Sequence, residues 1–242
     1  MQTITQLRAR IGALEGIPDP SADRPAATLG LQSIDATLPW GGLPAGGLHE
    51  IRAERADRPA AAQGFAAYCL GRLARQRPGP LVWVSQGSEL YPPGLADLGL
   101  PIERLLLVRP ARAAELPWSL EEALRCQAVA GLLGEVRGLD LTAARRLSLA
   151  ARGSGVPALL LNSGAELAAT LTRWRVRALP SQAPFGVGVG AWRWDLTLAR
   201  CRGLAAGEEN WQVEVKHATG GFNLVALSQH RPAEKAGRRQ VG

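Results

Sequence analysis

The fold of this 242-residue chain is decided by one stretch, Leu31-Gln-Ser-Ile-Asp-Ala-Thr-Leu-Pro-Trp-Gly-Gly-Leu-Pro-Ala-Gly-Gly-Leu-His-Glu-Ile51. Glycine and proline crowd its middle and predict turns there, and its end leads into a short strand over Gly47–Ala53. An alanine-rich helix is predicted directly afterwards, over Pro59–Arg77, with a proline in its first turn. A strand followed by a helix is the repeating unit of a parallel α/β sheet, so the stretch predicts where such a sheet begins.

The same alternation of strand and helix continues downstream. Strands are predicted over four ranges: Leu81–Ser85, Arg104–Val108, Ala128–Val136 and Ala158–Asn162, and the continuous apolar run of the first is typical of a parallel strand buried on both faces. Helices are predicted between them over residues 91–98, 116–127 and 142–152, with Ser119 as the N-cap of the second and Gly153 ending the third. Strands joined by helices predict a mainly parallel sheet with right-handed crossovers.

From Arg173 onward the hydrophobic period changes. Residues 173–178, 192–202 and 211–217 alternate apolar and polar side chains, which is typical of antiparallel strands with one solvated face. The predicted fold class is therefore α/β, with a mainly parallel sheet flanked by helices and a C-terminal antiparallel strand extension. We expect three parts: an N-terminal helix and linker over 1–27, a core domain over 28–228 and a basic, flexible tail over 229–242.

Composition places the chain among ordered globular proteins, with 46% hydrophobic and 20% charged residues. Its apolar runs are about ten residues long, well below the ~20 that a membrane helix needs, and the N-terminus carries no secretory signal pattern. We therefore expect a cytoplasmic protein without membrane association. The three cysteines, Cys69, Cys126 and Cys201, are odd in number and far apart, which favours small core residues over a disulfide framework or a zinc site.

Positive charge is concentrated in the last third of the chain. Residues 1–172 hold 17 arginines against 16 acidic residues, whereas residues 173–242 hold nine arginines and two lysines against five acidic residues. This balance favours an acidic partner or nucleic acid. The candidate contacts are Arg173, Arg175, Arg177, Arg193, Arg200, Arg202, Arg231, Lys235, Arg238 and Arg239.

Two alternatives stay open for these strands, and a second candidate interface lies at the N-terminus. The strand arginines fit a solvated polar face as well as a binding face, and Trp174, Trp192 and Trp194 fit core packing as well as base stacking. The N-terminal helix is predicted to dock on a partner or on a second copy of the chain through one apolar stripe, formed by Ile4, Leu7, Ile11 and Leu14.

The opening stretch resembles the start of the core domain of RecA-type recombinases, where Leu-Asp-x-x-Leu-Gly-x-Gly-Gly-Leu-Pro-x-Gly leads into a strand ending in Glu-Ile. In that family a glycine-rich phosphate loop with a lysine follows. Here the matching residues run Arg52-Ala-Glu-Arg-Ala-Asp-Arg-Pro-Ala60, with Pro59 in the region of the lysine and no glycine to form a phosphate nest.

Two more positions of that family's ATPase differ in this chain. Gln86 stands where the recombinases carry a glutamate that activates water, and Gly134 stands at the magnesium-associated aspartate. Glu135 is one residue beyond, where an exposed or capped strand end is expected and a residual metal ligand is the alternative. The resemblance therefore implies a RecA-like core that is not an enzyme and binds no cofactor.

Further phrases narrow the resemblance. They are Gly-Leu-Pro-x-Gly-x-Leu-His-Glu ending at Glu50, Leu-Asp-Leu-Thr-Ala-x-Arg-Arg-Leu ending at Leu147, and Thr172-Arg-Trp174 with tryptophan-rich strands after it. Over roughly residues 28–225 the chain is similar to ImuA-type proteins, the RecA-like proteins of bacterial damage-inducible mutagenesis cassettes.

That resemblance implies an accessory role in SOS-induced translesion synthesis. The implied partners are an ImuB-like relative of the Y-family polymerases and an error-prone replicative-type polymerase, with RecA or a second copy as further candidates and DNA contacted only indirectly. A SulA-like inhibitor of cell division and a single-stranded DNA-binding module are the alternative functions.

Overall fold

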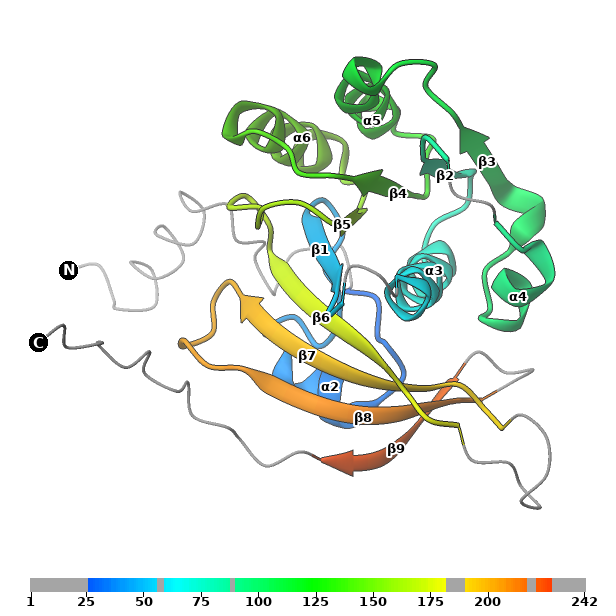
Figure 1. Ribbon diagram of the computed structural model, residues 1–242. Helices are drawn as coiled ribbons and strands as arrows, with labels where there is room; N and C mark the ends of the chain where they lie inside the picture. The colour runs from blue at the N-terminus through cyan, green and yellow to red at the C-terminus, as the bar shows by residue number, and fades with distance from the viewer. Residues whose placement is uncertain (1–25, 56–58, 88–89, 182–189, 217–220, 228–242) are drawn as a thin grey trace, which may run out of the picture.

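A computed structural model describes residues 26–55, 59–87, 90–181, 190–216 and 221–227. Nine strands form one sheet in the order β3-β2-β4-β5-β1-β6-β7-β8-β9. Pairing is parallel from β3 to β6 and antiparallel from β6 to β9. The predicted α/β class with a C-terminal antiparallel extension is therefore confirmed (Figure 1).

The strands are β1 (Leu48–Ala53), β2 (Leu81–Val84), β3 (Leu105–Val108), β4 (Gly131–Val136), β5 (Ala158–Asn162), β6 (Thr172–Leu179), β7 (Arg193–Cys201), β8 (Glu209–Lys216) and β9 (Gly221–Leu227). The helices are α2 (Gln32–Thr37), α3 (Ala60–Ala74), α4 (Pro92–Asp97), α5 (Leu116–Arg125) and α6 (Leu141–Ser154), with 3₁₀ turns η1 (Ile102–Arg104) and η2 (Ala113–Glu115). None of these helices is both long enough and apolar enough to span a bilayer.

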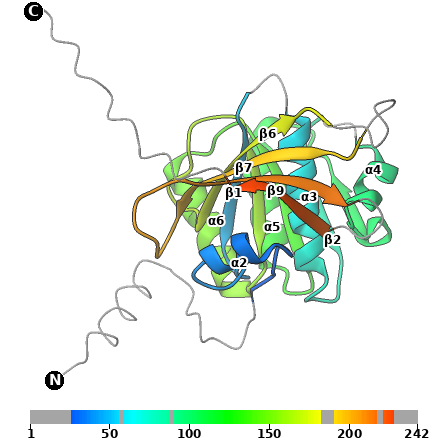
Figure 2. The same ribbon diagram turned by 90° about the horizontal axis from the view of Figure 1, so that it is seen from below.

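Helices cover the two faces of the sheet unequally. Helices α5 and α6 lie over one face of the parallel half, and α3 lies against the other face, with α4 beside it and α2 beneath the antiparallel strands (Figures 1 and 2). Two hydrophobic cores result, one between α3 and the sheet and one beneath α5 and α6. The face of β6–β8 that points away from α3 carries polar side chains instead.

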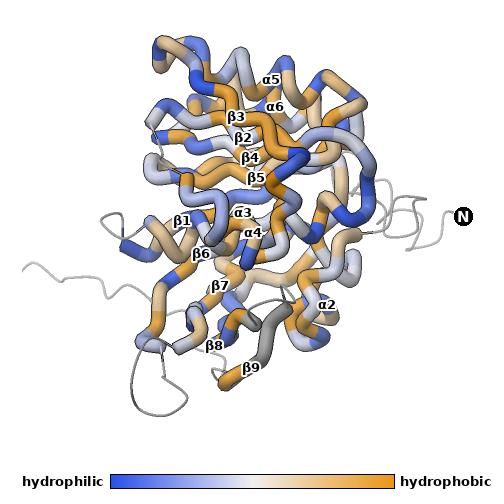
Figure 3. Tube along the Cα trace, turned by 90° about the vertical axis from the view of Figure 1, so that its right-hand side faces the viewer, coloured by the Kyte–Doolittle hydropathy of each residue, from blue (hydrophilic) through white to orange (hydrophobic). Residues whose placement is uncertain are grey.

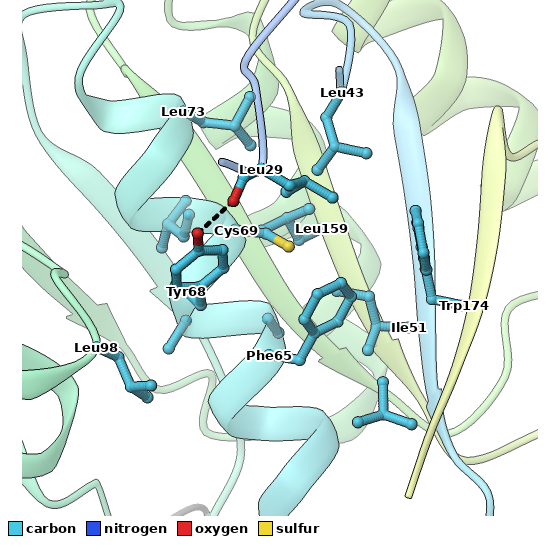
Figure 4. Packing of buried hydrophobic residues seen from close by; sticks show 14 of the residues in the cluster. Leu29, Leu43, Ile51, Phe65, Tyr68, Cys69, Leu73, Leu98, Leu159 and Trp174 are labelled. Carbon is cyan, nitrogen blue, oxygen red and sulfur yellow. Dashed lines mark hydrogen bonds between the residues drawn. The ribbon is translucent and has the colours of Figure 1, made fainter. Parts of the chain in front are cut away.

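Helix α3 is the centre of the larger core. Its small residues let it approach neighbouring backbone closely: a Cβ on Gly71 would lie 2.6 Å from the carbonyl oxygen of Gly99. Tyr68 reaches across the core, and its hydroxyl donates to the carbonyl of Leu29, while Phe65 faces Trp174 (Figure 4). The alanine-rich composition therefore reflects a helix buried on most of its surface.

Several local predictions were wrong, for identifiable reasons. Ser119 lies inside α5 and its hydroxyl donates to the carbonyl of Glu115, so it is no N-cap. Helix α6 continues past Gly153 to Ser154 and is capped by Gly155, which has a positive φ of 74°. Cys126 is exposed and Cys201 half-buried, so only Cys69 is the buried core residue that we expected. Helix α2 and strand β9 were not predicted.

Candidate partner interfaces

The positions matched to the recombinase ATPase lie near the C-terminal ends of β1, β2 and β4. Pro59 directly precedes α3, and Gln86 is exposed beyond β2. Gly134 faces α5, where an added Cβ would lie 2.5 Å from Cδ2 of Leu120. A carboxylate at position 134 would therefore enter the apolar core under α5 unless Leu120 moved.

We expected Glu135 to be an exposed or a capped strand end, and the exposed form of that expectation is wrong. Its side chain lies on the α3 face of the sheet and is half-buried. Oε1 accepts from the indole Nε1 of Trp83 at 2.9 Å and from Nε2 of Gln63 at 3.3 Å, and Oε2 accepts from the hydroxyl of Ser85 at 3.2 Å. The carboxylate thus links β4, β2 and α3. No group of three metal-ligating side chains occurs within the described ranges, and the interpretation of Glu135 as a metal ligand gains no support from its neighbours.

A second carboxylate, Glu50, is fully buried in the centre of the sheet. It accepts from Nε of Arg173 at 2.7 Å, from Nδ2 of Asn162 at 2.7 Å and from the backbone N–H of Leu167. Arg52 also lies 3.1 Å from it. Because a buried charge needs paired and hydrogen-bonded surroundings, this network fixes the β5–β6 connection onto β1.

Arg173 is therefore not accessible as a contact for a partner, contrary to the prediction. It is buried, and its guanidinium also donates to Glu166 at 2.6 Å and to the carbonyl of Leu167 at 2.9 Å. Sequence reasoning placed Arg173 on the correct strand face but missed its partner. The available signal was Glu50 itself, since a carboxylate in a central strand that is covered on both faces requires a cation nearby.

His49, next to Glu50, belongs to a buried chain of hydrogen bonds. Its Nε2–H donates to the carbonyl of Pro44 at 3.0 Å. Its Nδ1 accepts from the hydroxyl of Thr172 at 2.9 Å, and that hydroxyl oxygen in turn accepts from Nε1 of Trp174 at 3.0 Å. The ring is therefore held neutral, and burial lowers its pKa from 6.5 to about 4.

Acidification is expected to destabilise the protein through His49. The folded-state pKa is depressed, so neutral His49 contributes stability above pH 6.5 that is lost as the pH falls towards 4. The loss amounts to at most about 3 kcal/mol. Urea unfolding at pH 7 and pH 4.5 measures this loss of unfolding free energy, with His49→Gln as the control. Subtracting the values for the variant from those for the wild type removes the contribution of other titrating groups. If the difference in unfolding free energy between the two proteins is the same at both pH values, the prediction is contradicted.

The two outer arginines of β6, of which Arg175 is half-buried and Arg177 exposed, are paired with acidic neighbours. Arg175 lies 2.5 Å from Glu208. Arg177 contacts Asp195 on β7 and lies 3.0 Å from Glu54. On the sheet face that carries these side chains, positive and negative charges therefore alternate, and the face is not a continuous basic surface.

The arginines in β7 and directly after it have mostly backbone partners. Arg200 and Arg202 donate to the carbonyl of Ala168, and Arg202 also donates to the carbonyl of Thr170. Arg193 lies 3.5 Å from the carbonyl of Pro180, and its buried Nε has no acceptor among the residues that the structure describes. The remaining predicted contacts, Arg231, Lys235, Arg238, Arg239 and the stripe Ile4, Leu7, Ile11 and Leu14, lie outside the described residues.

Two of the three clustered tryptophans belong to the core. Trp174 and Trp194 pack against Phe65 of α3 with ring centroids 5.5 Å and 6.2 Å away. Core packing is thereby confirmed for both. Trp192 is half-buried and lines an open cavity of about 480 Å³ with Trp194, Tyr91 and Leu95. This mainly apolar hollow is large enough for an anchoring side chain of a partner.

The strand β3 forms an exposed apolar edge of the sheet. Leu106, Leu107 and Val108 are 54%, 40% and 37% exposed, and their outer side has no neighbouring strand in the described part of the chain. Figure 3 shows β3 as a continuous hydrophobic stretch on the face turned to the viewer. An unpaired apolar edge of this kind is a template for strand pairing with another chain.

Comparison with known proteins gives two curated relatives. The protein ImuA of Caulobacter vibrioides strain NA1000 is 36% identical over 240 residues, which cover 89% of this chain and 96% of the relative. The protein ImuA of Caulobacter vibrioides strain ATCC 19089 matches to the same extent. No protein-family model matches the chain.

Proposed function

The chain belongs to the ImuA family, and from this membership we propose that it is a non-enzymatic accessory protein of damage-induced mutagenesis. In this role it joins an ImuB-like relative of the Y-family polymerases to an error-prone replicative-type polymerase. The observation that carries the proposal is the identity of 36% across nearly the whole of both chains. In this proposal the protein itself does not bind DNA, and its partners make the DNA contacts.

The surroundings of the former nucleotide positions support a role without ATP hydrolysis. Pro59 has no backbone N–H for a phosphate, and Gln86 has no basic group for activating water. Gly134 faces apolar side chains, and the acceptor oxygens of the nearby Glu135 are occupied by Trp83 and Ser85. A protein that lacks a reacting group acts through its surfaces, so its partner sites become the central question.

The β3 edge is the best-formed surface for the first partner. Strand addition supplies backbone hydrogen bonds, while alternate side chains set specificity. Leu106 and Val108 project to one side of the sheet and Leu107 to the other, so an added strand would cover apolar surface on both sides. We assign the Y-family polymerase relative to this edge.

Replacing Leu107 by aspartate should weaken that complex at least about tenfold, because a charge would be buried in the new strand pair. Surface plasmon resonance with the purified ImuB-like protein of the same cassette measures the dissociation constant. Leu204→Asp is a matched control, since Leu204 and Leu107 are both 40% exposed and Leu204 lies in the turn after β7. Circular dichroism confirms that both variants fold.

Three outcomes contradict parts of the proposal separately. Failure of the wild-type protein to bind the ImuB-like protein, after nuclease treatment and at high salt, contradicts the accessory role. Equal binding by the wild type and Leu107→Asp moves the interface away from β3. Recovery of a tubulin-like division protein from damaged cells in place of a polymerase relative would favour the division-inhibitor alternative.

A further inference from the structure

A second surface, distinct from β3, lies along the outer side of α6. It is a groove of about 440 Å³ between α6 and the residues that precede β6. Its floor and walls include Leu141, Arg145, Leu149, Arg152, Ala168 and Arg202. We call it the α6 groove.

The leucines of the α6 groove have no role in the core. Helix α6 packs on the sheet through a separate inner stripe that includes Leu147 and Ala151, both buried. Leu141 and Leu149 are 49% and 65% exposed on the outer side. They stand eight residues apart, about 12 Å along the helix, so they offer apolar contact over roughly two turns.

The arginines of the groove differ from those elsewhere on the surface. Arg145 and Arg152 are exposed and seven residues apart, about two helical turns, which places them on the same side of α6. Arg202 lines the same groove, and its guanidinium donates to the carbonyls of Ala168 and Thr170. The neighbouring Arg146, in contrast, lies 2.5 Å from Glu121.

Acidic side chains are missing from the lining of the α6 groove, as far as the described residues define it. On the sheet face, Arg175 and Arg177 are offset by Glu208 and Asp195. The groove therefore combines a local excess of positive charge with exposed apolar surface. This combination complements a ligand that is both acidic and apolar.

We infer that the α6 groove binds an acidic amphipathic helix of a partner protein. Two carboxylates of that helix, about two turns apart, face Arg145 and Arg152, and the apolar side chains between them cover Leu149. A polynucleotide fits less well, because Leu149 stands between the two arginines. A phosphate backbone that reaches both would bring charged oxygens against this apolar side chain, and their loss of water costs free energy. The inference is independent of the protein that the β3 edge binds.

The test uses the full chain and a designed probe. The probe is a fluorescent alanine-based peptide of about 20 residues, with glutamates at i, i+7 and i+14 and leucines at i+3, i+4 and i+11. Fluorescence anisotropy should show saturable binding that weakens as salt is raised. The double variant Arg145→Glu/Arg152→Glu should weaken binding at least about tenfold, and Leu149→Asp should weaken it severalfold.

The controls separate the groove from general electrostatics. Arg75→Glu/Arg137→Glu makes the same change of charge at exposed positions outside the groove, and its affinity should match the wild type. A peptide with glutamine in place of glutamate should bind more weakly than the probe. The inference fails if the wild type does not bind the probe, or if both double variants lose affinity equally. It also fails if an oligothymidine of about 20 nucleotides binds more tightly than the probe through the same arginines.

Discussion

Replacing Arg173 by methionine is expected to lower the free energy of unfolding by about 3–5 kcal/mol, the largest effect of any charged residue described here. The methionine side chain would fill the space of the Arg173 methylene groups. Glu50 would stay fully buried, however, and would lose the guanidinium that lies 2.7 Å from its Oε2. The half-buried Arg52 would remain 3.1 Å from Glu50, but one partly exposed cation does not offset the desolvation of a fully buried carboxylate, and this costs stability. Urea unfolding followed by circular dichroism measures the change.

Arg175→Met is the matched control on the same strand. Arg175 is two residues further along the same face of β6, and its pair with Glu208 is partly exposed, so we expect a change below about 1 kcal/mol. A double variant, Glu50→Met/Arg173→Met, should recover part of the loss because no buried charge remains unpaired. If Arg173→Met and Arg175→Met lose equal stability, the Glu50 network is not what holds the β5–β6 connection.

The second large effect is expected for Trp174→Ala, at about 3–5 kcal/mol. The indole is 1% exposed and packs between Phe65 of α3 and Trp211 of β8, with ring centroids 5.5 Å and 6.1 Å away. Removing the indole leaves a cavity between α3 and the antiparallel strands. The substitution also removes the Nε1–H that donates to the hydroxyl oxygen of Thr172.

Trp118→Ala provides the comparison, because Trp118 on α5 is 62% exposed. Its removal should change stability by less than about 0.5 kcal/mol. Thermal unfolding of both variants, monitored by far-ultraviolet circular dichroism, distinguishes them without relying on tryptophan fluorescence. Similar transition temperatures would show that Trp174 is not part of a tightly packed core.

The sequence predicted the elements of the sheet better than the contacts between them. Strands such as β2 and β5 are short apolar runs between turn residues, and helix α3 follows a proline, so local pattern is sufficient to find them. Helix α2 is short and lacks a strong apolar period, so its sequence alone does not predict it. Strand β9, in contrast, is a mainly apolar run that local pattern could have found. The end of α6 shows the same limit as α2, because Gly153 and Gly155 are equivalent until the backbone angle is known.

The candidate site was predicted less well, since its chemistry depends on contacts between distant segments. Alternation correctly placed Arg173, Arg175 and Arg177 on one face of β6. It could not show that Arg173 is covered by the loop before β6 and paired with Glu50, 123 residues away. The groove residue Arg145 was noticed only as part of a motif, because its neighbours across the groove come from 168–169 and 202.

The position of β1 in the sheet has a consequence for synthesis on the ribosome. This early strand lies between β5 and β6, so its register partners emerge more than 100 residues after it. Helix α3 likewise exposes its aromatic side until Trp174, Trp194 and Trp211 have been translated. The nascent chain therefore carries an incomplete core during most of its elongation, and we expect a strong requirement for chaperones that hold apolar segments until β8 leaves the exit tunnel.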